Sequence, residues 1–441
     1  MFTDNFTSKR VRLALICSTL ILVLVPFHAF LTIWLSSIFG HYTALRLWSL
    51  GLLLIALLAL KLLFWHDKAL RKRLLKEPLI RLIIIYLSIQ IIWGIGALTT
   101  HHVDAKALGY GLLVNVRFLL FFAVTWIMST KSAWLHKQWP KLVFWPAVVV
   151  IVFGILQYLV LPNDFLKHFG YGPTTIYPFE TINHNVHHIR ILSTLRGANP
   201  LGAYLVVVLS LALVQFVRLK QKRLGYGLLG LAGILTLIFS FSRSAWLGFG
   251  VAAGVILVNF YYKSQHARHW LIAGGIGLLL VVGAGIAMLG HNTALQDALL
   301  HTDNHSTVSR SSNQDHLSAL RGGLRDLFHE PLGRGPGTAG PASVYNNHPA
   351  RIAENYFVQV GQETGWLGLL SFLAINILIA CKLWVRRADP LALGLLAALI
   401  GVSVVNMLSH AWTDDTLAFL WWGLAGVAIA GSIKKPKPTE Q

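Results

Sequence analysis

Two arginines in this sequence have the spacing and the surroundings of an anion-binding site. In the stretch HIRILSTLRGANPLG, Arg190 and Arg196 precede an apolar run that begins near Pro200. Proline suits the first turn of a helix, and the unpaired N–H groups of that turn add partial positive charge. Two guanidiniums beside a helix N-terminus predict a site for an anion, above all phosphate. The alternative is a pair of solvated loop arginines.

Two further arginines interrupt apolar sequence. Arg243 lies in FSFSRSAWLG, a tight turn between two apolar runs, where it either reaches lipid phosphate or binds a specific anionic ligand. Arg117 lies in LLVNVRFLLFF, in the middle of an apolar run. An arginine at that depth needs a partner inside a helix bundle, so it belongs either to a functional site or to a structural ion pair.

The stretch 332–369 is a glycine-rich loop that leads into an apolar helix. Gly333, Gly335 and Gly337 permit close approach of the backbone. Polar residues then precede the apolar run, namely Asn346, His348, Arg351, Glu354 and Asn355. Glu354 at the helix entrance either takes part in a site or only stabilises the first turn of the helix.

Composition places these motifs in a membrane protein. The chain has 441 residues, of which 55% are hydrophobic and 12% charged, and soluble domains carry about twice that charged fraction. Apolar runs of roughly 18 to 24 residues recur along its length, and each can cross a bilayer as a helix. We expect an all-α integral membrane protein with about 12 transmembrane helices, forming a single polytopic domain over residues 1–441. The expected spans are 13–35, 45–64, 79–98, 107–128, 142–161, 200–217, 226–241, 245–261, 270–289, 356–381, 390–409 and 417–433.

The loops between these spans predict the topology. With twelve spans, all clusters of Lys and Arg fall on one side, so both termini are expected in the cytoplasm. The opposite, external side receives two long loops, 162–199 and 290–355. Leucine spacing in 317–327 predicts an amphipathic helix in the second loop, either on the membrane surface or solvated.

The net charge of +20 follows from the same loops. Basic residues beside membrane spans arise without a functional demand, so we expect membrane lipids and no nucleic acid as partners. The histidine-rich stretch 183–188 has no third spaced ligand. We therefore expect no metal and no cofactor.

Taken together, the motifs resemble the O-antigen ligase and O-antigen polymerase superfamily of multispanning glycosyltransferases. The resemblance covers residues 190–370 by motif and the whole chain by topology. A pattern of arginine, glycine and NP-x-LG corresponds to Arg196, Gly197, Asn199, Pro200, Leu201 and Gly202. The Ser-Arg turn of the family corresponds to Ser242 and Arg243, followed by Gly248. The glycine loop and the closing motif correspond to Gly333, Gly335, Gly337, Glu354, Asn355, Val358, Glu363 and Gly365.

The resemblance implies a GT-C-like enzyme of the bacterial cytoplasmic (inner) membrane that acts at its outer face. The donor would be a glycan linked to a polyprenyl diphosphate, and the acceptor a glycan or lipid hydroxyl. Inverting transfer would need no metal, since forked guanidiniums can hold the diphosphate. Arg196 and Arg243 are the first candidates for that role, and Arg190 and Arg117 are the second candidates.

The resemblance also assigns the remaining roles. Glu354 stands where the family places a general base, and His348 is the second candidate. Gly335, Gly337, Asn355 and Glu363 would position the loop. The ligases of the family carry a histidine at the position of Glu354, which favours an O-antigen or exopolysaccharide polymerase here. A ligase, and a transporter or flippase of an anionic substrate, are the alternatives.

Overall fold

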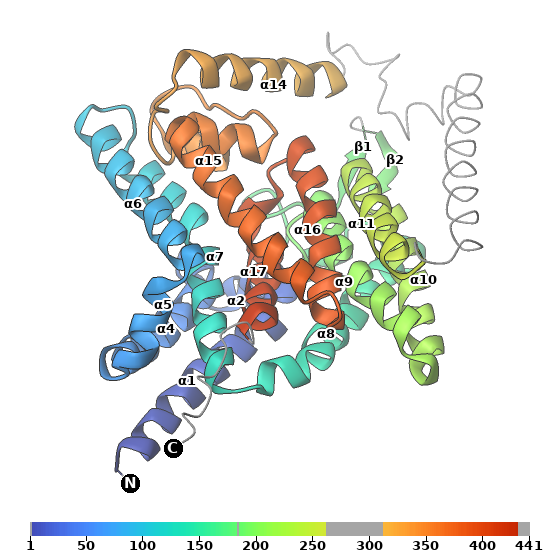
Figure 1. The fold of residues 1–441 in the computed structure, drawn as a ribbon. Helices are drawn as coiled ribbons and strands as arrows, with labels where there is room; N and C mark the ends of the chain where they lie inside the picture. Colours follow the sequence, from blue (N-terminus) through green and yellow to red (C-terminus); the bar gives the residue numbers. More distant parts are fainter. Residues whose placement is uncertain (1, 183–184, 262–311, 431–441) are drawn as a thin grey trace.

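The computed structural model describes residues 2–182, 185–261 and 312–430, and they form a bundle of α-helices (Figure 1). In this part of the chain, ten segments are long and apolar enough to cross a membrane. They comprise α1 (Phe2–Leu24) continued through η1 (Val25–Phe27) into α2 (His28–Phe39), then α4 (Trp48–His66), α6 (Pro78–Thr99), α7 (Ala105–Lys131), α8 (Trp134–Leu159), α9 (Ala198–Arg218), α10 (Arg223–Phe239), α11 (Arg243–Tyr261), α15 (Tyr356–Val385) and α16 (Pro390–Leu408). An all-α polytopic membrane protein is thereby confirmed.

The predicted spans and these helices correspond closely. A shorter apolar helix, α17 (Asp415–Ile429), lies where the last span was expected. The predicted span 270–289 and the first part of the second long loop, 290–311, lie outside the described residues. Short elements complete the chain, namely α3 (Tyr42–Leu45), α5 (Lys68–Lys76), η2 (Phe165–Phe169), η3 (Lys220–Lys222), η4 (Gly340–Tyr345) and η5 (Ala411–Thr413).

Local capping signals set several helix starts. The side chain of Asn355 accepts a hydrogen bond of 3.0 Å from Val358 N at the start of α15. Asp389 does the same for Leu391 N, at 3.1 Å, before α16. Asp414 accepts from the first-turn amides of α17. Each carboxylate or amide satisfies donors that a helix end leaves unpaired, so these polar residues fix where the spans begin.

Contacts between loops divide the bundle into two faces. Three ion pairs join segments that follow or precede predicted spans, namely Lys131–Asp67 at 2.7 Å, Lys382–Glu77 at 3.0 Å and His136–Asp389 at 2.6 Å. Arg218 at the end of α9 donates to the carbonyl of Arg387 at 3.1 Å and lies over the ring of Phe260 near the end of α11. The loops that carry most basic residues therefore meet on one face, called the basic face below.

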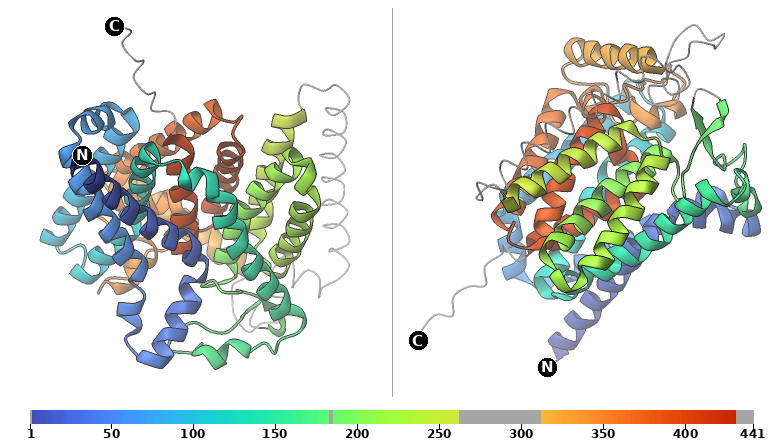
Figure 2. Two further views of the ribbon diagram at one scale, coloured as in Figure 1. Left: turned by 90° about the horizontal axis from the view of Figure 1, so that it is seen from below. Right: turned by 90° about the vertical axis from the view of Figure 1, so that its right-hand side faces the viewer.

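The opposite face, called the loop face, carries residues 162–199 and the described part of the second long loop, 312–355. A small antiparallel hairpin pairs β1 (Glu180–Ile182) with β2 (Asn185–Arg190), an element that the apolar spacing did not predict. Residues 183 and 184 of the histidine-rich stretch lie outside the described residues. The segment α2 follows the turn that contains Pro26 and lies beside this loop (Figure 2). Its Ile33 belongs to a buried cluster with Leu166 and Leu192.

An amphipathic helix, α14 (Ser312–His329), lies across the loop face above the start of α15 (Figure 1). Arg351 holds it through ion pairs to Asp326 at 2.8 Å and Glu330 at 2.9 Å. Gln362 of α15 also donates to Asp326, at 2.8 Å. Leu327 is buried beside α15. The leucine spacing thus coincides with a helix that covers the end of the bundle.

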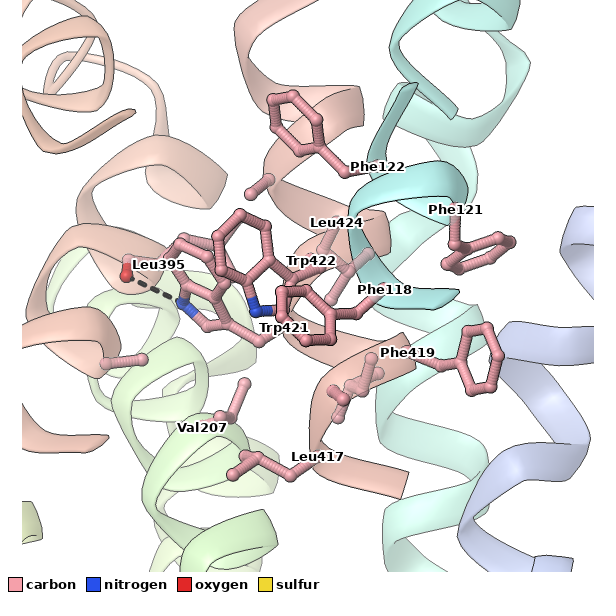
Figure 3. Packing of buried hydrophobic residues seen from close by; sticks show 14 of the residues in the cluster. Phe118, Phe121, Phe122, Val207, Leu395, Leu417, Phe419, Trp421, Trp422 and Leu424 are labelled. Atoms are coloured by element: carbon pink, nitrogen blue, oxygen red, sulfur yellow. Dashed lines mark hydrogen bonds between the residues drawn. The ribbon is translucent and has the colours of Figure 1, made fainter. Parts of the chain in front are cut away.

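The centre of the bundle is a group of aromatic side chains around α17 (Figure 3). The rings of Phe118 on α7 and Trp422 on α17 lie 4.8 Å apart, and Trp421 donates to the carbonyl of Leu395 on α16 at 3.0 Å. A helix that is apolar on all sides is stable only when neighbours surround it. This packing fixes α17 against α7 and so fixes the acidic start of α17 at the loop face.

Candidate active site

Three cavities lie side by side on the loop face and share lining residues. The central cavity, of about 330 Å³, is lined by Arg196, Glu354 and His410 among others. The α11 cavity, of about 510 Å³, shares Glu354 and Asn199 with it. The α2 cavity, of about 280 Å³, shares Arg196 and Asp414 with it. Residues from the two long loops and from the ends of five spans therefore converge on one continuous region.

The α11 cavity contains two of the predicted arginines. Arg190 donates to Asn199 Oδ1 at 2.7 Å and to the carbonyl of Ser240 at 3.1 Å. Its Nη1 lies 3.3 Å from Glu180 Oε2. Burial lowers the pKa of Arg190, while the charge of Glu180 raises it. Arg243, from the turn before α11, lines the same cavity, so two guanidiniums from distant parts of the chain meet there.

The rim of the α11 cavity is apolar. It is formed by Leu247, Leu317, Leu320, Met407 and Leu408. Leu247 and Met407 are more than half exposed, at 54% and 55%. Exposed side chains of this kind on a membrane span face lipid, so the cavity that holds the two arginines is continuous with the apolar surface of the bundle.

Glu354 stands between the central and the α11 cavities. It has a φ of 51°, a left-handed backbone conformation that costs a non-glycine residue about 1–3 kcal/mol. Its neighbour Asn355 is held in place, because it caps α15 and also donates to the carbonyl of Met407 at 2.9 Å. Glu354 forms an ion pair with His316 of α14. The helix α14 thus brings an imidazole to a carboxylate that lines both cavities.

Arg196 and His410 define the other side of the central cavity. Nε of Arg196 lies 3.7 Å from Asp414 Oδ2, the carboxylate that also caps α17. Burial, and secondly the charge of Arg196, lower the pKa of His410 to about 4. His410 is therefore a neutral imidazole at pH 7, able to accept or donate a hydrogen bond.

The glycine loop is held by a buried carboxylate rather than by the cavities. Glu363 Oε1 accepts from Gly337 N at 2.8 Å, and Oε2 accepts from Asn115 Nδ2 at 2.6 Å. The φ of Gly335 is 102° and that of Gly337 is 86°, both in the left-handed region. These contacts join the loop to α7 and α15 and fix the chain that leads to Glu354.

Two of the predicted site residues lie apart from this region. Arg117 Nε is 3.0 Å from Asp415 Oδ1, and Arg117 also donates to the carbonyl of Thr413 at 2.6 Å. His348 lies at the carbonyl of His101, with Nε2 at 3.2 Å. Neither side chain lines the three cavities. A buried arginine needs an opposite charge, and the carboxylate at the start of α17 supplies it, so Arg117 joins two helices.

Sequence reasoning missed His316 as a site residue. The leucine spacing of 317–327 predicted a helix, but it carries no information on which surface that helix covers. The available signal was that His316 is a polar residue directly before Leu317, the first leucine of the series.

A comparison with known protein families finds a match over part of the chain. Residues 227–373 match the O-antigen ligase family. This range includes Arg243, the glycine loop and Glu354, which the structure brings to the loop face. A search of curated proteins finds no match to the chain. This match covers about a third of the chain, and together with the ten candidate spans of the described residues it supports a relationship to the O-antigen ligase and O-antigen polymerase superfamily.

Proposed function

We propose that this protein transfers a glycan from a polyprenyl diphosphate to an acceptor hydroxyl. One observation carries the proposal, namely that Arg190 and Arg243 line the same cavity as Glu354, beside an apolar rim. Diphosphate is an anion with several acceptor oxygens, and guanidiniums bind it in forked geometry. The apolar rim suits the polyprenyl chain, which stays in the bilayer while the diphosphate enters the cavity.

The proposed step is a direct displacement at the anomeric carbon. The acceptor oxygen forms a bond to that carbon as the bond from carbon to phosphate oxygen breaks. The electron pair of the broken bond stays on the diphosphate, where Arg190 and Arg243 stabilise its developing charge. The proton of the acceptor hydroxyl passes to Glu354. Attack on the side opposite the leaving group inverts the anomeric configuration.

We assign Arg196 to the junction between donor and acceptor, since it lines the central cavity with Glu354. His316 would stabilise the carboxylate form of Glu354 before it takes the proton. Gly335, Gly337, Asn355 and Glu363 position Glu354 through the loop and the helix cap. We assign Arg117 and His348 no direct part, because neither side chain lines any of the three cavities.

The reaction is proposed at the outer face of the bacterial cytoplasmic membrane. The basic face would then be cytoplasmic, with both chain termini on that side, as the distribution of Lys and Arg favours. The substrates would be a polyprenyl-diphosphate-linked glycan and a glycan or lipid acceptor.

Within this class we propose a polymerase, which transfers the growing glycan to another lipid-linked repeat unit. The basis is Glu354, which stands where the ligases that the sequence resembles have a histidine. Transport is the weaker alternative. A transporter is expected to have ionisable groups near the midplane of the bilayer that bind its substrate. Arg117, the strongest such candidate in the described part of the chain, is instead paired with Asp415.

The test uses purified protein in nanodiscs and a polyprenyl-diphosphate oligosaccharide, without nucleotide sugar or added metal. A ladder of longer lipid-linked products is the expected result. Transfer to a different acceptor lipid only would indicate a ligase. Movement of the oligosaccharide across a proteoliposome membrane, without transfer, would indicate a transporter.

Variants assign the roles. Arg243→Gln and Glu354→Gln should each lower the rate by about 100-fold or more, because each removes charge or proton transfer from the step. Arg321→Gln is the matched control, since Arg321 is exposed on α14 and lines none of the three cavities. Normal product length in Arg243→Gln would overturn the proposed role of the α11 cavity.

A further inference from the structure

The α2 cavity has a different chemical character from the α11 cavity. Its lining includes His28, Thr32, Tyr42, Arg46, Tyr110 and Tyr345. Arg46 and Arg196 face Asp414 and Asp415 there, so positive and negative charges balance. In the α11 cavity, Arg190 and Arg243 line the wall with Glu354, and Arg190 is also paired with Glu180. The balanced charges of the α2 lining suit a neutral polar ligand there.

Two buried side chains on α2 line this cavity and carry polar atoms without a partner among the described residues. Thr32 is 2% exposed and His28 is 6% exposed. Thr32 Oγ1 and His28 Nδ1 have no hydrogen-bond partner among the described residues. The other ring nitrogen of His28 lies 3.7 Å from Asp415 Oδ2. Buried polar groups without partners are costly, so they point to a ligand that supplies hydrogen bonds.

Tyrosine rings form another part of the cavity wall. The rings of Tyr110 and Tyr345 lie 5.2 Å apart and nearly edge to face. Arg46 donates to the hydroxyl of Tyr110 at 2.6 Å and lies over its ring. Aromatic faces pack against the C–H surfaces of a ligand, while hydroxyl, imidazole, carboxylate and guanidinium groups bond to hydroxyls. This combination fits a saccharide.

We infer that the α2 cavity binds the acceptor glycan, an inference that rests on the proposed function. Direct displacement requires the acceptor oxygen on the side of the anomeric carbon opposite the diphosphate. The α11 and α2 cavities flank the central cavity, which shares Glu354 with the first and Arg196 with the second. A diphosphate in the α11 cavity leaves the α2 cavity as the place for the sugars that carry the attacking hydroxyl.

The test measures saccharide binding separately from transfer. The probe is the repeat-unit oligosaccharide released by mild acid from the lipid-linked substrate, titrated calorimetrically into protein in nanodiscs. Thr32→Val and His28→Ala should weaken its binding about five- to tenfold, since each removes one hydrogen bond to the ligand. Binding of inorganic diphosphate, which the α11 cavity would hold, should not change.

Thermal unfolding distinguishes this role from a structural one. Thr32→Val removes a hydroxyl that has no partner within the described chain, so the melting temperature should stay the same or rise while saccharide binding weakens. Thr19→Val is the matched control on the same span, because its hydroxyl bonds to the carbonyl of Leu15 at 2.8 Å. That control should leave saccharide binding unchanged.

Failures of the two proposals can be separated. The α2 assignment would be overturned by undiminished saccharide binding in both Thr32→Val and His28→Ala, or by a wild-type protein that does not bind the saccharide. In either case, transfer by the wild-type enzyme would still uphold the proposed function. Absence of transfer by the wild-type protein would overturn the function itself. Because the inference rests on that function, this outcome would remove its basis.

Discussion

Nε of Arg117 lies 3.0 Å from Oδ1 of Asp415, joining the middle of α7 to the first residue of α17. The side chain of Arg117 is 4% exposed, so this guanidinium has little access to water. The pair connects the aromatic centre of the bundle to the loop face, where Asp414 and Asp415 line the cavities. The sequence alone did not decide whether Arg117 belongs to a functional site or to a structural ion pair. In the structure it holds two helices together.

Arg117→Met should destabilise the protein strongly. It leaves the carboxylate of Asp415 without its main partner, and breaking a buried pair from one side costs about 3–5 kcal/mol. Thermal unfolding in detergent measures the change. The double variant Arg117→Met, Asp415→Leu should recover part of the loss. Lys167→Met, which breaks the exposed pair with Asp164, is the control and should leave the melting temperature unchanged.

Gly337→Ala should destabilise the glycine loop. Gly337 has a φ of 86°, and a Cβ there would overlap the backbone of Ala107 on α7. The expected loss is about 2 kcal/mol or more, from left-handed strain and from displacement of α7. Gly109→Ala on α7 is the control, because a Cβ at that position meets open space. Equal melting temperatures for the two variants would contradict the loop contact.

Two adjacent glycines of α14 test whether its docking supports the site. A Cβ at Gly323 would lie 2.6 Å from Ala353 Cβ and 2.7 Å from Val358 Cγ1, whereas one at Gly322 meets nothing. Gly323→Ala should push α14 away, weaken the contact of His316 with Glu354 and slow glycan transfer about tenfold. Hydrogen exchange of α14 should increase in parallel. Gly322→Ala should retain activity, and slow transfer in that variant would argue against docking as the cause.

Stability should fall in mildly acidic solution because of His410. Its pKa is about 4 in the folded protein, against an ordinary value of 6.5. Below pH 6.5 the unfolded chain therefore binds a proton that the folded chain excludes, and stability decreases until the pH reaches about 4. The loss attributable to this group is at most about 3 kcal/mol. Melting temperatures at pH 7 and pH 5 measure it, and His410→Gln should show a smaller difference between them.

The sequence by itself determined the class of the protein and, within the described residues, the positions of its membrane-spanning helices. Three signals carry this information, namely the length of apolar runs, the capping residues and the one-sided distribution of Lys and Arg. Each depends on a few neighbouring residues or on a single span, so each can be recognised from a short stretch of sequence. The same local reading identified Arg190, Arg196, Arg243 and Glu354 as polar groups at helix ends. It did not identify the hairpin of residues 180–190, whose strands are short and pair in a loop.

Only the tertiary structure decided which of these groups meet. Arg190 and Arg243 reach one cavity because α9, α10 and α11 pack against each other, and His316 reaches Glu354 because Arg351 and Gln362 fix α14. Arg117 finds Asp415 almost 300 residues further along the chain. Such encounters depend on packing angles and on side-chain directions of whole helices. A linear pattern does not contain these quantities.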